Sequence, residues 1–386
     1  MKIVFLSAFA LDANASLVNA LSKNNDVYFF IEALYKVSNF LDRSKLREII
    51  TIGKNVEELQ HIKDFINLDK TYVVKGTRNI NVLKKLYISY KVNQWVKKIS
   101  PDVIIIDNYM LTYFVSTLDY RKKMLMIVHD PFLHSGENYF IDRYLRKLHF
   151  NLIDYKILLN ENQKNDFITY YHFNPKHIFT SFLGVYDFLR FYNYKNVESK
   201  SFNILFFGRI SPYKGIKYLL DGFITILSSY PEYSNKISLT IAGSGDFDFD
   251  LKPYKSFENI LFINNYIDPK NLAQLIDQAS IVVCPYTDAT QSGVIMSAFA
   301  FKKPVIATNV GGLPEMVQNG ETGIIIEPKD SNAIAKAILE IYENKDLRNK
   351  ISNNIEQKYF FGEKSWKNSA QRFSDVLNKI DKTINL

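Results

Sequence analysis

Short apolar segments alternate with longer amphipathic segments along most of the chain. The short segments are apolar at consecutive positions and are bounded by turn residues, as is typical of parallel strands that helices cover on both faces. The first series of such segments reads KIVFLS, DVYFFIE, DVIIIDN, KMLMIVHD and YKILLN, and the second reads NILFFG, ISLTIAG, NILFIN, SIVVCPY, KPVIAT and GIIIE. Strands that alternate with helices in two series predict an α/β protein with two Rossmann-like, doubly wound parallel sheets that face a cleft.

A polar stretch without periodicity, FLRFYNYKNVESKSFN, separates the two series. We therefore predict an N-terminal domain over residues 1–190, a linker over 191–202 and a C-terminal domain over 203–362. The last segment, 363–386, is expected to form a helix that can cross back to the first domain. At roughly 150 residues per domain, the length of 386 residues suits this division.

Composition excludes several classes of protein. Apolar residues make up 47% and charged residues 23% of the chain, which is ordinary for a folded soluble protein. The single cysteine, Cys284, cannot form an internal disulfide, and no apolar run reaches the roughly 20 residues of a membrane span. We therefore expect a cytoplasmic protein and exclude a disulfide scaffold, a coiled coil and an integral membrane protein.

The positive charge lies in the first half of the chain. Residues 1–200 contain 28 Lys and Arg against 20 Asp and Glu, whereas residues 201–386 contain 20 of each. This asymmetry predicts that the first half meets an anionic partner such as a phosphorylated substrate, a lipid surface or a nucleic acid. No recognised nucleic-acid-binding module is present in the sequence, so nucleic acid is not the expected partner.

The most basic segment is predicted to form a helix. The sequence NVLKKLYISYKVNQWVKKI carries several lysines, among them Lys84, Lys85 and Lys91, next to a stripe of Leu, Tyr and Trp side chains that includes Trp95. Such a helix can lie on an anionic bilayer, which would place the protein on the inner face of the plasma membrane. The alternative is that the same stripe packs the helix on the first sheet and leaves the lysines solvated.

Ligands of open α/β sheets bind at the carboxyl ends of the strands, so the loops that follow strands are the candidates for ligand binding and catalysis. The loop GRISPYKG supplies Gly208, the guanidinium of Arg209 and the ammonium of Lys214 before a predicted helix. Two cations and free backbone N–H groups at a helix start suit a diphosphate. The alternative is a surface turn with incidental charges.

A second loop, YTDATQSGV, precedes an apolar helix that is predicted to begin at Ser292 and Gly293. The first N–H groups of a helix have no partner within the helix and carry a partial positive charge. The N–H groups of Gly293 and Val294, aided by the Ser292 hydroxyl, therefore form a candidate anion site that would face the predicted cleft.

Two further signals in the second half are weaker. Gly243 begins the sequence GSGD, which lacks the third glycine of a dinucleotide fingerprint, so a nicotinamide cofactor is not expected. Asp246, Asp248 and Asp250 alternate in DFDFD and could bind a divalent metal, but a solvated loop is the preferred interpretation. We therefore expect neither a metal nor another cofactor.

In the first half, the segment VHDPFLHSGE follows a strand and contains His129, Asp130 and His134. A zinc site is not expected, because a convincing third ligand and the helical spacing of a zinc motif are missing. A histidine at a strand end can instead hydrogen-bond a sugar or a phosphate, and the alternative is a structural histidine. Asp130 and His134 are candidates on the acceptor side.

Four segments in the second half of the chain together resemble one known family. The segments GRISPYKG, IAGSGD, SGVIMSAFAFKKPVIATNVGGLPEMV and NGETGIII resemble the nucleotide-binding half of glycosyltransferase family 4 over roughly residues 200–330. The resemblance implies a GT-B fold, a nucleotide-sugar donor (UDP-sugar favoured over GDP-sugar), catalysis without a metal and retention of anomeric configuration. It also implies transfer of a hexosyl or N-acetylhexosaminyl group to a glycan or lipid-linked acceptor, in surface polysaccharide or glycolipid synthesis.

The same resemblance implies roles for single residues. Arg209 and Lys214 would neutralise the donor diphosphate, and the N–H groups at Ser292–Val294 would bind the distal phosphate or the sugar. The backbone of Tyr266-Ile267 would contact the base, and His129 would contact the donor sugar. The leaving phosphate would itself take the acceptor proton.

The chain departs from that family at two acidic positions. Typical members carry two glutamates around this loop, and the corresponding residues here are Ala289 or Thr290 and Ser297 or Ala298. Thr290 and Gln291 can supply neutral hydrogen bonds to the sugar instead. Two alternatives therefore stay open: a non-hydrolysing nucleotide-sugar epimerase on the same fold, and a catalytically silent partner subunit of an active transferase.

Overall fold

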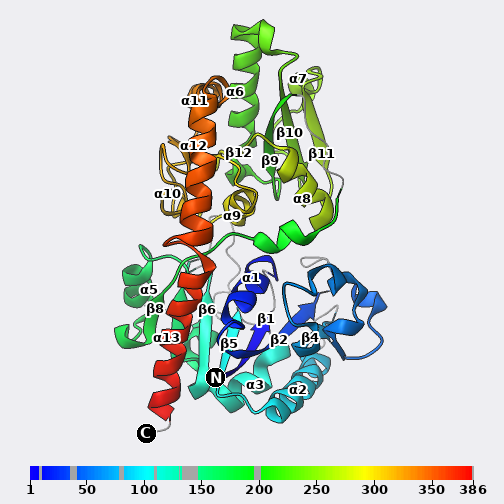
Figure 1. Cartoon of the computed structure of the whole chain (residues 1–386), viewed down its shortest axis with the longest axis vertical. Coiled ribbons are helices and arrows are strands. Elements are labelled where there is room, and N and C mark those ends of the chain that lie inside the picture. Colours follow the sequence, from blue (N-terminus) through cyan, green and yellow to red (C-terminus); the bar gives the residue numbers. More distant parts are fainter. Residues whose placement is uncertain are drawn as a thin grey trace. The chain divides into compact units, whose positions relative to one another are not determined.

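The computed structural model describes residues 1–7, 11–34, 41–77, 82–107, 111–129, 131–132, 147–194 and 201–384. These residues form two compact units, each built on a sheet of its own. Unit 1 combines Met1–Gly184 with the C-terminal segment Lys364–Leu386, and unit 2 comprises Val185–Glu363. Figure 1 labels most of the helices and strands of both units.

Unit 1 is built on an eight-stranded sheet with the order β3-β4-β2-β1-β5-β6-β7-β8. Neighbouring strands are parallel except β3 and β4, which pair antiparallel at one edge. Strands β1, β5 and β6 are almost wholly buried, which explains their uninterrupted apolar sequences. The strands are β1 (Lys2–Ser7), β2 (Asp26–Ala33), β3 (Ile50–Ile52), β4 (Thr71–Lys75), β5 (Val103–Asp107), β6 (Met124–Val128), β7 (Tyr155–Leu158) and β8 (Ile178–Thr180).

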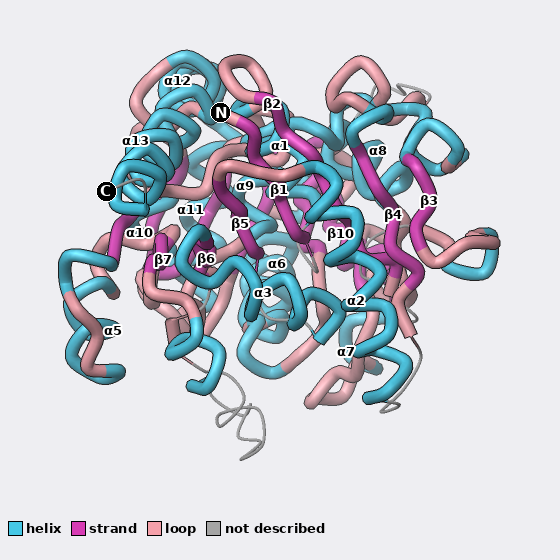
Figure 2. Tube along the Cα trace, turned by 90° about the horizontal axis from the view of Figure 1, so that it is seen from below, coloured by secondary structure: helices cyan, strands magenta, loops and turns pink. Residues whose placement is uncertain are grey.

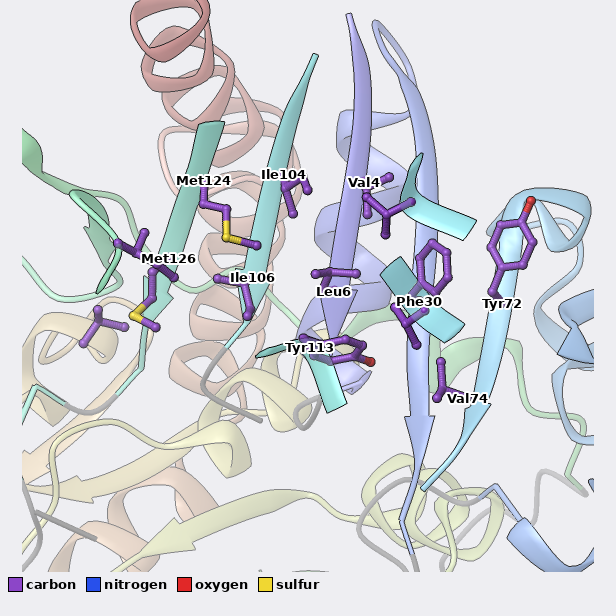
Figure 3. Packing of buried hydrophobic residues seen from close by; sticks show 14 of the residues in the cluster. Val4, Leu6, Phe30, Tyr72, Val74, Ile104, Ile106, Tyr113, Met124 and Met126 are labelled. Atoms are coloured by element: carbon purple, nitrogen blue, oxygen red, sulfur yellow. The ribbon is translucent and has the colours of Figure 1, made fainter. Parts of the chain in front are cut away.

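One apolar stripe of helix α2 packs against the central strands of this sheet. The stripe presents about one buried side chain per helical turn, as an amphipathic helix on a sheet should. Helices α2 and α3 lie side by side (Figure 2). The core cluster, drawn in part in Figure 3, includes Val4, Leu6, Phe30, Ile104 and Ile106 from the strands and Ile88, Val92, Val96 and Ile99 from α2. The α-helices that the structure describes in unit 1 are α1 (Leu11–Leu21), α2 (Val82–Ile99), α3 (Phe114–Tyr120), α5 (Lys164–Tyr171) and α13 (Trp366–Ile384).

The C-terminal helix α13, red in Figure 1, packs against α1 within unit 1. Trp366 at its start lies on Gly184, where a methyl group would come within 2.5 Å of the indole ring. The buried hydroxyl of Ser369 lies 2.9 Å from the hydroxyl of Ser181. These contacts fasten the end of the chain to the unit that contains its beginning.

Unit 2 is built on a six-stranded, wholly parallel sheet with the order β11-β10-β9-β12-β13-β14. The strand order reverses between β9 and β12, and the carboxyl ends of strands at such a point are where α/β sheets bind ligands. The strands are β9 (Phe202–Phe207), β10 (Ile237–Gly243), β11 (Ile260–Asn264), β12 (Ile281–Cys284), β13 (Val305–Thr308) and β14 (Gly323–Ile326). The helices are α6 (Ile216–Ser229), α7 (Lys252–Lys255), α8 (Pro269–Gln278), α9 (Gly293–Ala300), α10 (Leu313–Met316), α11 (Ser331–Glu343) and α12 (Lys345–Ile355).

The predicted fold class, with two parallel α/β sheets, is confirmed. Each strand predicted from the sequence is present, and β3, β4 and β8 are additional. Strands β3 and β8 have three residues each, which is too short for an apolar pattern to stand out. Among the described residues, no helix combines the length and the apolar character that crossing a membrane requires.

Candidate functional site

The loops after β9 and β10 touch backbone to backbone at the carboxyl edge of the unit 2 sheet. The N–H group of Gly208 donates to the carbonyl of Ala242 at 3.0 Å, and that of Ile210 donates to the carbonyl of Ser244 at 2.9 Å. Gly243 has a φ of 155°, and a Cβ atom there would lie 1.8 Å from the carbonyl oxygen of Gly208. Only glycine fits this position, so both predicted glycines set the path of the loop after β9.

The two predicted cations of that loop occupy different environments. Arg209 is exposed, whereas Lys214 is partly buried at the end of one 3-10 turn, Pro212–Lys214. The next residue, Gly215, has a φ of 63°, and a Cβ atom there would lie 2.0 Å from the carbonyl oxygen of Pro285. The turn therefore packs directly on the loop after β12, which carries the second predicted motif.

The ammonium group of Lys214 lies over two aromatic rings. Its Nζ is 3.6 Å from the ring centroid of Tyr286 and 4.9 Å from that of Tyr213. Burial lowers the pKa of Lys214 to about 8, the neighbouring Cys284 opposes this shift, and the positive charge of Arg209 adds to it. A phosphate bound beside Lys214 would raise its pKa again, because a nearby negative charge favours the ammonium form.

Ser292 is the N-cap residue of α9 and is buried. Its hydroxyl lies 3.3 Å from the hydroxyl of Tyr286 and makes no hydrogen bond to the first turn of the helix. The N–H groups of Gly293 and Val294, which are both partly exposed residues, are therefore the donors that the start of α9 offers to an anion. Through Tyr286 the structure brings the predicted cation Lys214 and this helix start together.

Thr290 and Gln291, the predicted neutral partners of a sugar, precede the helix directly and are partly buried. Their loop is fixed from the other side by the turn after β13. A Cβ atom at Gly311 would lie 1.5 Å from the carbonyl oxygen of Ala289, so the two backbones are in close contact. The loops after β9, β10, β12 and β13 thus form one packed layer that carries the predicted donor residues other than Tyr266 and Ile267.

A cavity of about 370 Å³ opens beside Tyr266 and Ile267, the two residues predicted to contact a base. Half of the Tyr266 surface is exposed. Apolar walls and amide groups that both donate and accept hydrogen bonds suit a flat heterocycle. Sequence reasoning missed the amides, although they recur along one face of the α8 segment. The other lining residues are Ile263, Asn265, Asn271, Gln274, Leu275 and Gln278.

In unit 1, His129 directly follows β6 and pairs with a buried carboxylate. Its Nε2 atom lies 2.5 Å from Oδ1 of Asp107, the fully buried last residue of β5. The side-chain amide of Asn14 donates to the other oxygen of Asp107 and, at 2.9 Å, to the hydroxyl of Ser7. Asp107 thus holds the imidazole ring in a defined orientation.

Two more carboxyl groups lie at this end of the unit 1 sheet: Glu32 is buried and Asp12 is partly buried. Burial raises the pKa of Asp12, against the hydrogen bond from the N–H group of Ala13, which lowers it. Burial raises the pKa of Glu32 to about 7, although the hydroxyl of Thr112 donates a hydrogen bond of 3.0 Å to it. A polar cluster therefore lies at the carboxyl ends of β1, β2, β5 and β6, beside the apolar core of unit 1.

Sequence reasoning identified only part of this cluster. It selected His129 but missed Asp107 and Glu32, which stand at or next to the ends of β5 and β2. The available signal was an acidic residue at the end of an apolar strand. The carboxyl ends of neighbouring parallel strands meet at one edge of the sheet, so such residues lie close together. The other two predicted residues, Asp130 and His134, lie outside the described residues.

Helix α2 does not pack on the sheet by the aromatic stripe that the sequence suggested. Trp95 does face the core, with its ring centroid 5.1 Å from that of Tyr72. The alternative that the whole stripe is buried is wrong for three residues, because Leu83, Tyr87 and Tyr90 are exposed by 79%, 51% and 51%. The residues of α2 that pack on the sheet are offset by one position from the residues of the stripe. The helix therefore has two apolar faces, one against the sheet and one exposed to solvent.

The predicted lysines accompany the exposed face of α2. Lys84 is exposed, and Lys85 and Lys91 are partly buried. The Nζ atom of Lys91 lies 5.5 Å from the ring centroid of Tyr87. An exposed surface of Leu and Tyr side chains with lysines beside it is thus a feature of unit 1.

Among the described ranges, no group of three or more His, Cys, Asp and Glu side chains is placed to hold a metal ion. Asp246, Asp248 and Asp250 are exposed. Asp250 instead accepts a hydrogen bond of 3.0 Å from the backbone N–H group of Lys252. The DFDFD segment is therefore a solvent-exposed loop, as its preferred interpretation predicted.

Known proteins resemble this chain in sequence. Residues 201–344 match the family model for glycosyl transferases group 1. The uncharacterized glycosyltransferase MJ1607 of Methanocaldococcus jannaschii is 31% identical over 176 residues, which cover 45% of this chain and 44% of that protein. A second uncharacterized glycosyltransferase of the same organism, MJ1069, is 22% identical over 378 residues, covering 93% of this chain and 91% of that protein. The matched region thus spans less than half of the first relative and most of the second.

Solved structures resemble the chain over nearly its whole length. Sucrose-phosphate synthase from Thermosynechococcus elongatus has a TM-score of 0.67 at 16% identity and covers 99% of this chain and 100% of its own. HepE of Anabaena, in complex with UDP, has a TM-score of 0.60 at 18% identity and covers 100% of both chains. At these identities the likeness establishes the fold. Residues 201–344 therefore match the family model for glycosyl transferases group 1, in a chain whose two parallel α/β sheets resemble the fold of GT-B glycosyltransferases.

Proposed function

We propose that the protein is a retaining glycosyltransferase that transfers a hexosyl or N-acetylhexosaminyl group from a UDP-sugar to a glycan or lipid-linked acceptor. The observation that carries this proposal is that Tyr286 contacts both Lys214 and Ser292 at the start of α9, at the point where the strand order of unit 2 reverses. A diphosphate is an anion, and a cation beside the free N–H groups of a helix start provides the positive potential that binds it. The group 1 match over residues 201–344 includes both elements.

The diphosphate would be held by two kinds of positive group. Lys214 and the exposed Arg209 supply full charges, and the first turn of α9 supplies N–H groups and the positive end of the helix dipole. Negative charge grows on the leaving phosphate as its bond to the sugar breaks, and groups already in place stabilise that charge without reorganisation. A divalent metal does the same work in other phosphate sites, so we propose that transfer here is metal-independent.

The leaving phosphate would also take the proton of the acceptor hydroxyl. Departure and attack then occur on the same face of the sugar, which retains the anomeric configuration. Thr290 and Gln291, next to the start of α9, would hydrogen-bond the sugar hydroxyls in place of carboxylates. Contact between His129 and the donor sugar stays a prediction.

The base would enter the cavity beside Tyr266. Uracil presents two carbonyl acceptors and one N–H donor, and the amide groups of Asn271 and Gln274 in the cavity wall can match both kinds. The UDP complex of HepE, a protein of the same fold, supports UDP as the nucleotide. The cavity and the Lys214 site belong to the same unit and to one sheet, in which β10 lies between β11 and β9.

Unit 1 would dock on the anionic inner face of the plasma membrane through α2. The exposed side chains of Leu83, Tyr87 and Tyr90 can enter the headgroup region, with Lys84 and Lys91 beside them. Each basic residue near such a surface contributes about 1 kcal/mol. This placement suits an acceptor that is itself linked to a lipid, as in the synthesis of a surface polysaccharide or glycolipid.

Thermal denaturation of the purified protein with UDP-, GDP- and ADP-sugars, followed by product analysis, tests the function. Ligand at about 100 times its Kd stabilises a protein by about 2.7 kcal/mol, so UDP and a UDP-sugar should raise the Tm by several degrees and uridine by less. Slow release of UDP from the matching UDP-sugar should follow on incubation in water.

The same incubations separate the alternatives. Absence of any Tm shift with all nucleotides contradicts the proposal. Conversion of one UDP-sugar into its epimer without release of UDP identifies an epimerase. Tight binding without turnover, across a panel of donors and acceptors, identifies a catalytically silent subunit.

A further inference from the structure

Tyr286 follows β12 and contacts three elements of unit 2, although sequence reasoning gave it no role. The residue is completely buried. Its ring lies under Nζ of Lys214, its hydroxyl lies 3.3 Å from that of Ser292, and its carbonyl oxygen accepts a hydrogen bond of 2.6 Å from the hydroxyl of Thr308. One side chain therefore joins the cation of the first predicted loop to the start of α9.

The ring face of Tyr286 stabilises the positive charge of the partly buried Lys214 ammonium. At 3.6 Å from the centroid, Nζ of Lys214 is well within the distance at which a ring face attracts a cation. Among the residues that the structure describes, no carboxylate pairs with Lys214, whose titratable neighbours are Cys284 and Arg209. A carboxylate would stabilise the ammonium but would also compete with a phosphate for it, whereas an aromatic face stabilises the charge and leaves it available.

The other groups near Lys214 do not stabilise its ammonium as the ring of Tyr286 does. Arg209 is a like charge and lowers the pKa of Lys214, and the buried thiol of Cys284 has its own pKa raised to about 11 by burial, so it is neutral at neutral pH. Tyr213 presents a second ring, but 4.9 Å from Nζ, and its centroid is 6.5 Å from that of Tyr286 in an edge-to-face arrangement. Tyr286 is thus the nearer of the two rings.

We propose that Tyr286 is a positioning residue of the donor site, whose ring holds Lys214 as an ammonium and whose hydroxyl fixes the start of α9 through Ser292, so that both act on one diphosphate. This role rests on the proposed function, because it presumes a nucleoside diphosphate as ligand. Tyr286 itself touches no ligand in this scheme. It acts through the two groups that do.

Calorimetric titration with UDP and with uridine, between pH 6.5 and 9.5, tests this role. Tyr286→Leu keeps an apolar wall but removes the ring face, so it should weaken UDP binding about fivefold or more at pH 7, within the range of desolvated cation–π contacts. UDP affinity of the wild type should fall as the pH rises through about 8, where Lys214 loses its proton. In Tyr286→Leu this fall should begin at lower pH, because the ammonium has lost its stabilising partner.

Tyr286→Phe separates the role of the ring from the role of the hydroxyl. It keeps the ring and should keep the pH midpoint of the wild type, while UDP affinity falls about two- to threefold through loss of the contact with Ser292. Ser292→Ala should have the same effect, and the double variant should be no worse than either. Uridine affinity should be unchanged in every variant.

A buried tyrosine that only packs would give a different set of results. Tyr254→Phe is the matched control, because Tyr254 is also buried in unit 2 and donates a hydrogen bond of 2.6 Å to Asp221 outside the site. Wild-type UDP affinity and pH midpoint in folded Tyr286→Leu would overturn the ring role. If that variant does not fold, wild-type affinity in Tyr286→Phe and Ser292→Ala overturns the proposal. A wild-type protein that binds no nucleoside diphosphate refutes the proposed function instead.

Discussion

Lys214 and Arg209 are both expected to face a diphosphate, yet one is partly buried over aromatic rings and the other is exposed. Lys214→Ala and Arg209→Ala should each weaken donor binding and turnover about tenfold or more, because a hydrogen bond to a charged group is worth about 1.5–3 kcal/mol. Steady-state kinetics with the matching UDP-sugar checks this. Lys217→Ala is the control, since Lys217 is an exposed cation that pairs with Asp221 on α6. Near-normal kinetics in both folded variants would remove these residues from the site.

Glu32 shows how a buried carboxyl group makes stability depend on pH. Its pKa is raised to about 7, so between about pH 4.5 and 7 the folded protein holds a proton that the unfolded chain has released. Stability is therefore highest below this window and falls as the pH rises through it. Over the whole window the loss is of the order of 3 kcal/mol, at about 1.4 kcal/mol per pKa unit.

Glu32→Gln keeps the side-chain shape and removes the titration. The free energy of unfolding of this variant should rise relative to that of the wild type between pH 4.5 and 7.5, by up to about 3 kcal/mol. Urea denaturation at a series of pH values measures the difference. A difference that stays constant across the series would mean that Glu32 is not held as an acid in the folded protein.

At the scale of elements, α2 is the helix for which the pattern of apolar residues was ambiguous. Two apolar faces share this helix, and only contact with the sheet decides that Val92 and Val96 turn inward while Tyr87 and Tyr90 turn outward. A lysine-bearing helix with an outward apolar face is typical of helices that lie on membranes. Sequence alone could not select this face, because both faces have helical spacing.

Liposome co-sedimentation tests the membrane role of α2. The wild type should bind vesicles that contain anionic lipid, and binding should weaken at high salt because ions screen the attraction. Changing Lys84, Lys85 and Lys91 together to Glu should abolish it. Wild-type protein that stays in the supernatant with anionic vesicles at low salt would contradict docking and favour a soluble acceptor.

The control variant for this experiment changes the same charge elsewhere on unit 1. Lys23, Lys63 and Lys122 are exposed lysines outside α2. Their joint replacement by Glu lowers the net charge equally, so it should leave binding largely intact if α2 is the contact surface. Equal loss in both triple variants would mean that overall charge, rather than this helix, attracts the protein.

Between α11 and α12, a single N-cap residue divides a continuous amphipathic pattern into two helices. The segment AIAKAILEIYENKDLRNKI reads as one amphipathic helix, but the structure divides it into α11 and α12 at Asn344. The side chain of Asn344 accepts a hydrogen bond of 2.8 Å from the N–H group of Leu347 and so begins the second helix. Asparagine is a strong N-cap residue, and the periodic pattern continues across it unchanged.

For the molecule as a whole, the proposed chemistry predicts activity without a metal. Transfer should survive EDTA, because Lys214, Arg209 and the start of α9 supply the positive potential that Mg²⁺ would otherwise provide. Product formation with and without EDTA, and after addition of Mn²⁺, measures this. Loss of activity in EDTA with recovery in Mn²⁺ would contradict the prediction and direct attention to the exposed aspartates of the DFDFD loop.

The sequence by itself determined the strands other than β3, β4 and β8, their two series and the loops at their carboxyl ends, because apolar patterns and glycine positions are local properties of the chain. It thereby selected Arg209, Lys214 and the start of α9 as candidate site residues. The tertiary structure alone decided that Lys214 lies on Tyr286 and that His129 meets Asp107. Residues far apart in the chain meet only when parallel strands align their ends, and no pattern along the chain encodes which of them touch.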